Sequence, residues 1–390
     1  MNLAVLTSLY PSRALPTIGI FAERRWQGMS ARGHSVHVIH PVPLAPWPFV
    51  YGKWREIHSI PEHEERGDID VRAPRYIHVP KFPRANSSRF ARTGMKHLLA
   101  AGRPDAVICD YAWPASAAAT ELQELGIPCV ISGRGSDVLE VAGEAGLAAE
   151  LAKNLKTARH WCAVSKHLLL KMDRLGDGAG TLVANGVDTD FFDLRDQVVA
   201  RESLGIETRG TLIIVVGHLI PRKDPLLALE AFAQGAPADA ELVFIGGGEL
   251  LDELECQIAA KELAGRVRLA GSQTPEQLAS WYNAADCLLL TSHREGRPNV
   301  VLEALSSGCK VVATDAGGTG ELLSGLDSML VPGSDEHDPV AIGQRLKSVL
   351  ASNCDRAKLR EAVAELSWER SLDALEACIE NAIGDNADRT

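Results

Sequence analysis

The stretch CLLLTSHREGRPNVVLEALSSGCKVVATD, residues 287–315, reads as a strand, a polar loop, a helix and a second strand. Its two ends, CLLLTS and KVVATD, are short and apolar, as in parallel strands that are covered on both faces. The helix is expected over 298–308, because Pro298 suits the first turn of a helix and Gly308 suits the residue just past its end. This strand–helix–strand unit predicts an α/β fold.

Glu303 is the only charge on that helix, whose other residues are mostly apolar: Val300, Val301, Leu302, Ala304 and Leu305. A helix that is apolar on nearly every face is normally buried. A glutamate is almost never fully buried without a partner. We therefore expect Glu303 to border a cleft where it meets a polar group, and the alternative is a partly solvated helix residue.

The start of the same helix lies beside a loop that carries a second carboxylate, Glu295. The first turn of a helix has backbone N–H groups without intrahelical partners, and such groups bind phosphate readily. The residues at this helix start are Pro298, Asn299, Val300 and Val301. The sequence therefore predicts an anion site at this helix start, with Glu295 next to it.

Apolar strand-like runs alternate with helical patterns along the whole chain. The runs are 3–10, 35–42, 106–111, 129–133, 160–164, 211–217, 241–247, 266–271, 287–292 and 310–315. Helices fit between them, for example at 21–33, 114–126, 225–235 and 275–283. This alternation is typical of doubly wound, Rossmann-like α/β domains.

The length of 390 residues is too great for one ordinary core, and the strand pattern restarts at Thr211 with a very hydrophobic run. We therefore expect an N-terminal Rossmann-like domain over 1–193, a linker over 194–210 and a C-terminal Rossmann-like domain over 211–365. The last helix, within 366–390, is expected to pack back on the N-terminal domain. Such domains bind ligands at the carboxyl ends of their strands, so we expect the two domains to face a cleft.

Composition narrows the class of protein. A formal net charge of −11 argues against a general nucleic-acid binder. The eight cysteines are scattered without a C-x-x-C pair, so they read as buried thiols in a reducing compartment and not as disulfides or a zinc site. The N-terminal MNLAVLTSLYPS reads as a first strand and not as a signal peptide, and no apolar run is long enough to span a membrane. The sequence therefore predicts a cytoplasmic protein.

One segment departs from the acidic total. From Arg72 to Arg103 there are eight basic residues and no acidic residue. Four aromatic residues lie just upstream: Trp47, Phe49, Tyr51 and Trp54. Basic residues near aromatic ones suit an anionic membrane surface or a lipid-phosphate substrate. We therefore expect a peripheral contact with the inner face of a membrane, and a solvated basic face is the alternative.

Polar or glycine-rich loops follow five consecutive strands of the C-terminal half. In chain order they carry Gly217, His218, Arg222 and Lys223, then Gly246, Gly247 and Gly248, then Gly271, then Glu295, then the turn 316–321. Adjacent cations at a helix entrance can neutralise a diphosphate, and glycine lets the backbone approach a ligand closely. Each feature alone is explained equally well by a surface charge pair or an ordinary turn, but together they predict one ligand site.

The motifs VGHLIPRKDP, FIGGGE, RVRLAGSQ, AADCLLLTSHREGRPNVVLEALSSG and VVATDAGGTGELL resemble the C-terminal domain of GT-B glycosyltransferases of family 4. Glu295 and Glu303 match the E-x7-E pair of that family. In the N-terminal half, SLYPS, PTIGIFAERRWQGMSARGHSVHVIHP, the RGSD turn at 134–137 and VANGVDTDFF agree more loosely. The resemblance covers nearly the whole chain and is greatest to exopolysaccharide and teichuronic-acid-type sugar transferases.

The resemblance implies transfer of a sugar from a nucleotide-diphosphate donor, a UDP or GDP sugar, with retention at the anomeric carbon. The implied acceptor is a saccharide or a lipid-linked saccharide of cell-surface polysaccharide biosynthesis, and no nucleic acid takes part. The resemblance also implies no cofactor and no bound metal, because protein cations and helix N-termini hold the diphosphate.

By the same resemblance, Lys223 meets the diphosphate with help from Arg222, Glu295 contacts the transferred sugar, and Glu303 accepts hydrogen bonds from the donor ribose. The N–H groups near 298–301 hold phosphate and sugar. The remaining implied donor contacts are Gly19, which lets the backbone approach the diphosphate, and the turns at Gly246–Gly248 and Gly271, which surround the base. The implied mechanism is a front-face attack, in which the leaving phosphate takes the proton of the acceptor hydroxyl.

Two positions depart from the family pattern. His218 stands where the family usually has arginine, so one diphosphate cation is weakened or becomes pH-dependent. Arg134 stands where the family often has histidine, and it is a candidate ligand for another phosphate or a carboxylate. Asp137, in the same turn, is expected to contact the sugar or the acceptor, and the alternative for it is a helix N-cap.

Two rival functions remain open at the level of sequence. A nucleotide-sugar epimerase on the same scaffold would need no separate acceptor and would leave the nucleotide attached. A catalytically inactive, glycosyltransferase-like subunit or binding protein is disfavoured by Glu295, Glu303 and Lys223 occurring together, although His218 leaves it open. Fold alone does not decide between these functions.

Overall fold

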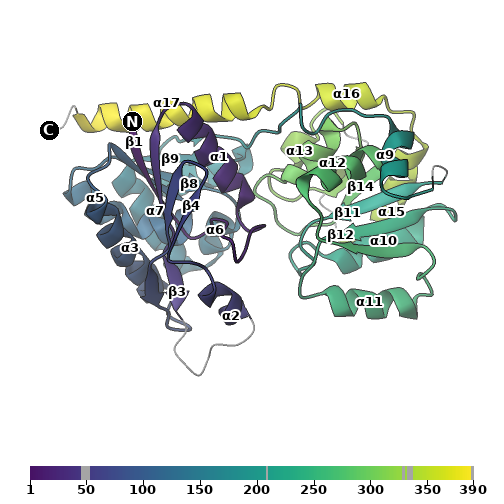
Figure 1. Cartoon of the computed structure of the whole chain (residues 1–390), viewed down its shortest axis with the longest axis horizontal. Helices are drawn as coiled ribbons and strands as arrows, with labels where there is room; N and C mark the ends of the chain where they lie inside the picture. The colour runs from purple at the N-terminus through teal and green to yellow at the C-terminus, as the bar shows by residue number, and fades with distance from the viewer. Residues whose placement is uncertain (45–52, 208–209, 327–329, 332–336, 388–390) are drawn as a thin grey trace. The chain divides into compact units, whose positions relative to one another are not determined.

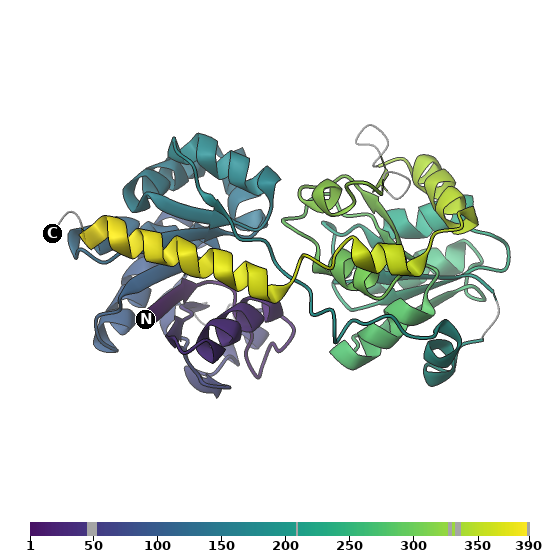
Figure 2. The same cartoon turned by 90° about the horizontal axis from the view of Figure 1, so that it is seen from above.

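The computed structural model describes residues 1–44, 53–207, 210–326, 330–331 and 337–387. The chain divides into two compact units, one formed by Met1–Ala184 together with Trp368–Thr390 and the other by Asn185–Ser367. Each unit is a sheet with helices packed against it (Figures 1 and 2).

The described residues of the first unit form ten strands and a set of helices, in the following order. They are β1 Asn2–Thr7, α1 Ile20–Ala31, β2 Ser35–Ile39, β3 Val42–Leu44, α2 Lys53–His58, β4 His63–Arg66, β5 Ile69–Arg72, β6 Arg75–Ile77, α3 Pro83–Ala100, β7 Ala106–Asp110, α4 Ala112–Ala115, η1 Ser116–Ala118, α5 Ala119–Glu124, β8 Cys129–Gly133, α6 Ser136–Leu139, η2 Val141–Gly143, α7 Ala145–Ala158, β9 His160–Ala163, α8 Lys166–Gly176, β10 Thr181–Leu182 and α17 Trp368–Ala387.

The second unit contains six strands among its described residues. Its elements are α9 Gln197–Ser203, β11 Leu212–Val216, α10 Pro225–Gly235, β12 Glu241–Ile245, α11 Leu251–Ala260, β13 Val267–Gly271, α12 Pro275–Ala284, β14 Cys287–Leu290, α13 Asn299–Ser306, β15 Lys310–Thr314, α14 Thr319–Leu322, β16 Leu330–Val331, α15 Pro339–Ala351 and α16 Arg356–Glu361.

Both main sheets are doubly wound, which confirms the predicted α/β class. The sheet of the first unit has the order β10-β9-β8-β7-β1-β2-β5-β4, and that of the second has the order β13-β12-β11-β14-β15-β16. Described pairs are parallel except β4–β5, which is antiparallel. The strand order reverses between β7 and β1 in the first sheet and between β11 and β14 in the second. Ligands of such sheets bind at these switch points.

Alternation along the strands explains why both faces of the first sheet are covered. Leu3 and Val5 of β1 face a core that includes α1 and α17, whereas Ala4 and Leu6 face the core on the other side. All four side chains are buried. Strands that are apolar on both faces are stable only when helices cover both faces. The near-continuous hydrophobic runs in the sequence indicate strands of this kind.

The boundary between the units falls at different residues from those expected. The segment predicted as a linker, 194–210, belongs to the second unit where it is described. Within it, α9 is fixed by Gln197, whose Nε2 donates to the carbonyl of Ala284 at 3.1 Å, and by Arg201, which pairs with Asp286 at 2.7 Å. The last helix, α17, is part of the first unit, and Leu375 and Ile379 on it join that unit's core.

The short strands β4, β5 and β6 of the first unit were not predicted. The stretch 63–72 is rich in charge, and the structure shows it as an antiparallel hairpin of β4 and β5 in place of the expected charged loop. Edge strands of this kind carry few apolar residues, because only one side of the hairpin meets the core. A search for apolar runs therefore misses them.

Candidate functional site

The switch point of the second sheet brings two predicted loops together. Strand β11 pairs with β14 through Ile213–Cys287 and Ile214–Leu288, although the two strands are far apart in sequence. The loop after β11 carries Lys223, and the loop after β14 carries Glu295. Both loops leave the carboxyl ends of neighbouring parallel strands, where ligands of such sheets bind.

Lys223 and Glu295 form a buried ion pair. The Nζ of Lys223 donates to the Oε1 of Glu295, and Arg222 lies 3.6 Å from the other oxygen, Oε2. Glu295 is only 7% exposed. Burial alone would raise the pKa of its carboxyl, but the charge and hydrogen bond of Lys223 and the charge of Arg222 lower that pKa below its ordinary value. The carboxylate is therefore ionised and paired with two cations.

Backbone contacts fix the loop that carries these cations. The hydroxyl of Thr291 donates to the carbonyl of Asp224 at 2.8 Å, and the N–H of His293 donates to the carbonyl of Arg222 at 2.9 Å. The carboxylate of Asp224 in turn caps α10 by accepting from the N–H of Leu227 at 3.0 Å. The position of Lys223 is thus set by a helix cap on one side and by the end of β14 on the other.

Helix α13 begins one residue later than expected. Pro298 is the N-cap residue and not the first helical residue, and no side chain caps this helix start. A proline N-cap has no side-chain acceptor for the first N–H groups of the helix. The first turn of α13 therefore presents backbone donors next to the Glu295 loop, as the anion site requires.

Glu303 has a protein partner that the sequence reasoning missed. The hydroxyl of Tyr282, a fully buried residue at the end of α12, donates to Oε2 of Glu303 at 2.9 Å. Burial and the neighbouring carboxylate raise the pKa of the Tyr282 hydroxyl well above its ordinary value, so the phenol stays protonated and remains a donor. Glu303 itself is half-buried. Tyr282 thus fixes one oxygen of the carboxylate on an otherwise apolar helix.

Two arginines donate hydrogen bonds to the backbone carbonyls at the C-terminal end of α13. Arg356 donates to the carbonyl of Ser307 at 3.0 Å and to that of Gly308 at 3.3 Å, and Arg360 donates to the carbonyl of Ser306 at 3.1 Å. Cations at a helix C-terminus compensate the negative end of its dipole. The positive end of α13 is left facing the Glu295 loop.

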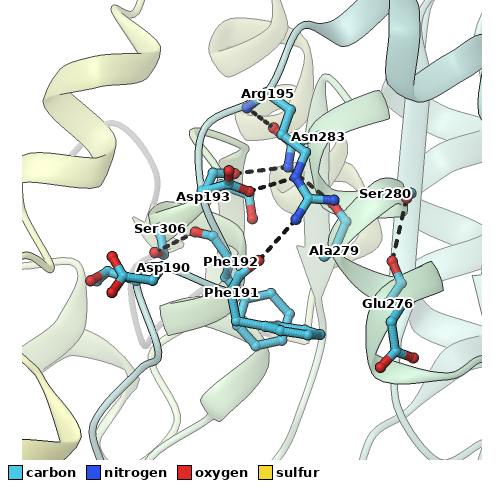
Figure 3. Close-up of polar contacts among 12 residues, drawn as sticks. Asp190, Phe191, Phe192, Asp193, Arg195, Glu276, Ala279, Ser280, Asn283 and Ser306 are labelled. Atoms are coloured by element: carbon cyan, nitrogen blue, oxygen red, sulfur yellow. Dashed lines mark hydrogen bonds and ion pairs between the residues drawn. The ribbon is translucent and has the colours of Figure 1, made fainter.

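The chain segment that enters the second unit is tied to both α12 and α13 (Figure 3). The N–H of Arg195 donates to Oδ1 of Asn283 at 2.7 Å, and Nδ2 of Asn283 donates to the carbonyls of Asp193 and Ala279 at 3.0 Å each. The hydroxyl of Ser306 donates to the carbonyl of Phe192 at 2.7 Å (Figure 3). Asn283 is fully buried, so one amide holds two separate stretches of backbone together.

A second tie joins the same segment to the start of α13. The Nδ2 of Asn185 donates to Oδ1 of Asn299, the first residue of the helix, at 3.1 Å. Asn185 is buried. Asn185 is the third residue of the loose family motif VANGVDTDFF, and this contact explains why that position has an amide side chain.

The three predicted glycine turns of the second unit lie next to one another. The N–H of Gly246 donates to the carbonyl of Gly271 at 2.9 Å, and the N–H of Leu219 donates to that of Gly247 at 3.0 Å. A Cβ on Gly246 would collide with the carbonyl oxygen of Gly217, and one on Gly248 would collide with Leu219. These turns therefore need glycine for close backbone packing as well as for any ligand, and their predicted contact with a base stays a prediction.

His218 lies beside the two cations of the same loop. The pKa of its imidazole is lowered by burial first and then by the charges of Lys223 and Arg222. The ring is therefore neutral at pH 7 in the ligand-free protein. A neutral imidazole supplies no permanent charge at the position where the family usually has arginine.

In the first unit, the guanidinium of Arg134 is held by an internal carboxylate. Its Nε and one terminal nitrogen donate to the two oxygens of Asp110, each at 2.7 Å, and Trp26 donates to Asp110 at 2.8 Å. Burial would raise the pKa of Asp110, but Arg134 and the nearby Arg25 lower it to about 2. Arg134 was expected to bind a ligand's phosphate or carboxylate. In the structure, its planar guanidinium donates to the carboxylate of Asp110.

Asp137 connects the turns that follow β7 and β8. Its carboxylate accepts from the N–H groups of Ala112 at 2.5 Å, Gly135 at 2.6 Å and Arg134 at 3.1 Å. It is 3% exposed, and burial raises its pKa to about 7 against the opposing effect of these hydrogen bonds. Asp137 lies inside the first turn of α6 and not at the N-cap position. The geometry supports a positioning role, and the predicted contact with a sugar or acceptor stays a prediction.

Gly19 precedes α1 with a φ of 80°, and a Cβ there would lie 3.2 Å from the backbone of Leu9. The turn therefore requires glycine for its own conformation. Its expected approach to the diphosphate stays a prediction.

Arg297 is a residue of the E-x7-E loop that the sequence reasoning did not single out. It is half-buried, and its Nε is buried without a hydrogen-bond partner in the part of the chain that the structure describes. Burial lowers the pKa of its guanidinium, and the charge of Glu321 opposes that change. An arginine directly before a helix start is a signal that could have been noted, because the helix dipole disfavours a cation there.

Three further properties concern the described residues as a set. Within them, no group of three or more His, Cys, Asp or Glu side chains is arranged to hold a metal ion. No helix in the described ranges combines the length and the apolar character that crossing a membrane requires. All eight cysteines are free thiols.

Family models match both halves of the chain. The model for Glycosyltransferase Family 4 matches residues 22–191, and the model for Glycosyl transferases group 1 matches residues 196–366. Among curated relatives, the chain is 28% identical over 342 residues to TuaC of Bacillus subtilis, which is named as a glycosyltransferase of teichuronic acid biosynthesis; the match covers 85% of each chain. It is also 34% identical over 209 residues to the D-inositol 3-phosphate glycosyltransferase of Geodermatophilus obscurus, a match that covers 50% of this chain and 46% of that protein.

Two solved structures illustrate the likeness in fold. The sucrose-phosphate synthase of Thermosynechococcus elongatus superposes with a TM-score of 0.79 at 18% identity, covering 99% of this chain and 100% of that one. HepE of Anabaena, solved in complex with UDP, superposes with a TM-score of 0.60 at 19% identity, covering 94% and 99%. At these identities the likeness shows the fold.

Proposed function

We propose that this chain, which belongs to the GT-B glycosyltransferases of family 4 type, transfers a sugar from a nucleotide-diphosphate donor with retention at the anomeric carbon. The observation that carries the proposal is the buried pairing of Lys223 and Glu295, with Arg222 beside it, next to the uncapped start of α13. We assign donor binding to the second unit and acceptor recognition to the first.

The diphosphate is assigned to Lys223, Arg222 and the first N–H groups of α13. Both cations face the single negative charge of Glu295, so the group keeps a net positive charge. A diphosphate placed at the helix start would take over these cations, and the carboxylate of Glu295 would then accept hydrogen bonds from the sugar hydroxyls. The charges are already fixed in place before the reaction, which is the arrangement that stabilises a developing anion most effectively. We propose on this basis that the reaction needs no bound metal.

Glu303 is assigned to the ribose of the donor. Its carboxylate is held in place by the hydrogen bond from Tyr282 and is half-buried, and a carboxylate accepts hydrogen bonds from sugar hydroxyls. The turns at Gly217, Gly246–Gly248 and Gly271 lie together and are assigned to the base. Support for a nucleotide comes from the relatives of known structure, since HepE was solved with UDP and with UDP-glucose, and a starch synthase IV with ADP and acarbose.

The proposed chemical step is a front-face displacement. The acceptor oxygen forms the new bond to the anomeric carbon on the face from which the β-phosphate oxygen leaves, and the departing phosphate takes the hydroxyl proton. Lys223, Arg222 and the N-terminus of α13 stabilise the charge on the leaving phosphate. No protein nucleophile is needed, and the nucleoside diphosphate is the second product.

The acceptor is proposed to be a saccharide or lipid-linked saccharide of a cell-surface polysaccharide. This rests on the match over 85% of the chain to a relative named for teichuronic acid biosynthesis. The chain is proposed to act in the cytoplasm.

A thermal-shift screen against UDP, GDP, ADP and TDP, with magnesium and with a chelator, tests the donor site. One diphosphate should raise the melting temperature selectively, and the rise should be the same with and without magnesium. In Lys223→Ala the rise should be lost. Lys261→Ala is the matched control, because it breaks a lysine–glutamate pair on the surface of the same unit and should leave the rise unchanged.

The transfer itself is tested by incubating the identified donor sugar with a set of saccharide acceptors and determining the anomeric configuration of the product by NMR. A product with the donor's configuration supports the proposal, and an inverted product overturns the front-face mechanism. An isomerised donor in the absence of acceptor would identify an epimerase. Failure to respond to every diphosphate would indicate an inactive subunit.

A further inference from the structure

Three large apolar side chains of the first unit are exposed close to one another. Leu44 is 38% exposed, Ile77 is 61% exposed and Phe82 is 60% exposed. Leu44 and Ile77 are register partners at the ends of β3 and β6, and Phe82 directly precedes α3. A single exposed leucine is ordinary, but neighbouring exposed apolar side chains indicate a surface that meets something apolar.

The backbone holds these side chains outward. The buried side chain of Asn86 accepts from the N–H of Val79 at 2.9 Å and donates to the carbonyl of Val79 at 2.8 Å. The N–H of His78 donates to the carbonyl of Leu44 at 3.2 Å. The loop between β6 and α3 is therefore fastened to a helix on one side and to a strand on the other, so Ile77 and Phe82 are presented by an ordered structure.

An aromatic residue borders the same surface. The ring of Trp54, on α2, lies 5.4 Å from the ring of His78, next to Ile77. Helix α2 and strand β3 lie together at one edge of the first unit in Figure 1. Tryptophan has an apolar body and one N–H, a combination that favours the interface between lipid and water. The upstream residues Trp47, Phe49 and Tyr51 lie outside the described residues and are not counted as part of this surface.

Basic side chains lie beside Phe82 and along the helix that follows it. Lys81 is exposed beside Phe82, and Arg84, Arg92 and Lys96 are exposed along α3 at spacings that place them on one face of the helix. Arg84 pairs with Glu150 at 3.5 Å while its side chain stays 60% exposed. Within the described residues Lys81, Arg92 and Lys96 have no ion pair. The acid nearest in sequence to Trp54 is Glu56, which is flanked by Arg55.

This charge is the opposite of that of the whole chain. The segment 72–103 carries eight basic residues and no acidic one, in a protein whose formal net charge is −11. Local positive charge on an acidic protein points to an anionic partner. Exposed leucine, isoleucine and phenylalanine beside a half-buried tryptophan, near lysines and arginines, match an anionic bilayer, because apolar side chains enter the headgroup region while cations attract the lipid charges.

We propose that Leu44, Trp54, Ile77 and Phe82, together with Lys81, Arg92 and Lys96, form a docking surface for an anionic lipid bilayer. Here these residues are called the docking surface. Binding needs both the apolar and the basic side chains. A few apolar side chains alone bind a membrane weakly, and the attraction of the cations alone is screened by salt. This docking is independent of the proposed transfer reaction, although it would place the enzyme where lipid-linked acceptors are found.

Co-sedimentation of the full-length protein with vesicles tests the docking surface. The protein should bind vesicles of phosphatidylcholine with phosphatidylglycerol, bind vesicles of phosphatidylcholine alone much less, and lose binding in high salt. Ile77→Ser with Phe82→Ser should lower the partition coefficient at least about tenfold. Lys81→Glu with Lys96→Glu should abolish the preference for anionic vesicles. Circular dichroism and the diphosphate thermal shift verify that the variants are folded.

Two exposed apolar residues elsewhere serve as a matched control. Leu170 on α8 is 57% exposed and Val199 on α9 is 62% exposed, so Leu170→Ser with Val199→Ser removes similar exposed apolar area. This control should bind vesicles as the wild type does.

Several outcomes would overturn the proposal. They are equal binding to neutral and anionic vesicles, unchanged binding after Ile77→Ser with Phe82→Ser, or an equal loss in the control. Self-association without vesicles that the same double substitution abolishes would identify a second protein copy as the occupant. Transfer to a soluble acceptor by a protein that binds no vesicle would overturn the docking surface alone, whereas vesicle binding without any transfer would overturn the proposed reaction alone.

Discussion

At the candidate donor site, one buried carboxylate faces two cations. Glu295 is buried and ionised because Lys223 and Arg222 face it, and each of these cations is in turn held by the backbone around it. An unpaired buried charge is strongly destabilising. Anything that binds here must therefore replace Glu295 as the partner of the cations, and a diphosphate has the charge to do so.

Glu303→Ala should weaken donor binding and lower kcat/KM more than about tenfold, or about 1.4 kcal/mol per factor of ten. The carboxylate is the only charged side chain of α13, and a charged acceptor binds hydroxyls more strongly than a neutral one. Isothermal titration with the identified diphosphate and steady-state kinetics measure the two effects. Tyr282→Phe removes only the supporting hydrogen bond and should have a smaller effect on both. Near-normal kinetics of Glu303→Ala would contradict the assigned role.

His218 should make diphosphate binding depend on pH. In the free protein, burial and the two cations lower the pKa of its imidazole below 6.5, so the ring is neutral at pH 7. A bound diphosphate adds negative charge and raises that pKa, so binding takes up a proton between the two values. Affinity should therefore increase as the pH falls below about 6.5. The control is His218→Gln, in which only the titration of the nucleotide itself remains; a wild-type slope equal to that of the control would exclude a role for His218.

At the scale of elements, helix α13 is held at both ends by contacts that the sequence does not display as a motif. Its start is joined to Asn185 through Asn299, and its end is capped by Arg356 and Arg360. Its flank is joined by Ser306 to the segment that Asn283 fastens to α12. The orientation of α13, the helix to which the diphosphate is assigned, thus depends on residues far from it in sequence.

Asn283→Ala should destabilise the second unit by about 2–3 kcal/mol, because it removes the hydrogen bonds that a fully buried amide makes to Arg195, Asp193 and Ala279. The midpoint of urea unfolding measures the change. Ser280→Ala, one turn earlier on the same helix, removes only an exposed hydroxyl that donates to Glu276 (Figure 3), and it should change stability by less than about 0.5 kcal/mol. Equal midpoints for the two variants would show that Asn283 does not hold the segment.

Prediction from sequence succeeded for elements that are formed by consecutive buried apolar residues. Strands such as β11 and β14 are apolar on both faces, and α10 was placed at Pro225–Gly235, the bounds found in the structure. It missed β4, β5 and β6, which are short and contain charged residues in place of a continuous apolar run. For the candidate site, the alignment of strand ends predicted that the loops of Lys223 and Glu295 would meet. The partners Tyr282, Asp110 and Asn185 were missed, because they are chosen by tertiary packing and not by local pattern.

At the scale of the whole molecule, the first unit is built from two separate stretches of chain. Helix α17 contributes Leu372, Leu375, Cys378, Ile379 and Ala382 to a core that also contains residues of β1, β7 and β8. It is also fastened by Arg32, which pairs with Glu369, Asp373 and Glu376 at 2.8–3.1 Å. The return of the chain is marked by a bridge between Val187 and Ser367 at the edge of the second unit.

Leu375→Ala should destabilise the first unit by about 2–5 kcal/mol, since the side chain is fully buried and its loss leaves a cavity. Hydrogen exchange should show lost protection in β7, β8 and β9 and unchanged protection in β11 and β12. Glu380→Ala, on the exposed side of the same helix, should leave exchange unchanged. Loss of protection in both units after Leu375→Ala would mean that the two do not unfold separately.

The discontinuity of the first unit has a consequence for how a ribosome produces this protein. Domains commonly fold in the order in which they are synthesised, the N-terminal one first. Here the core around Val5, Ile108 and Val130 cannot be completed before α17 is translated, and α17 follows every residue of Asn185–Ser367. The second unit is contiguous and can finish folding while the first still exposes one apolar face of its sheet. The nascent chain therefore completes its folding in reverse order, and the unfinished sheet is the surface that a chaperone would meet.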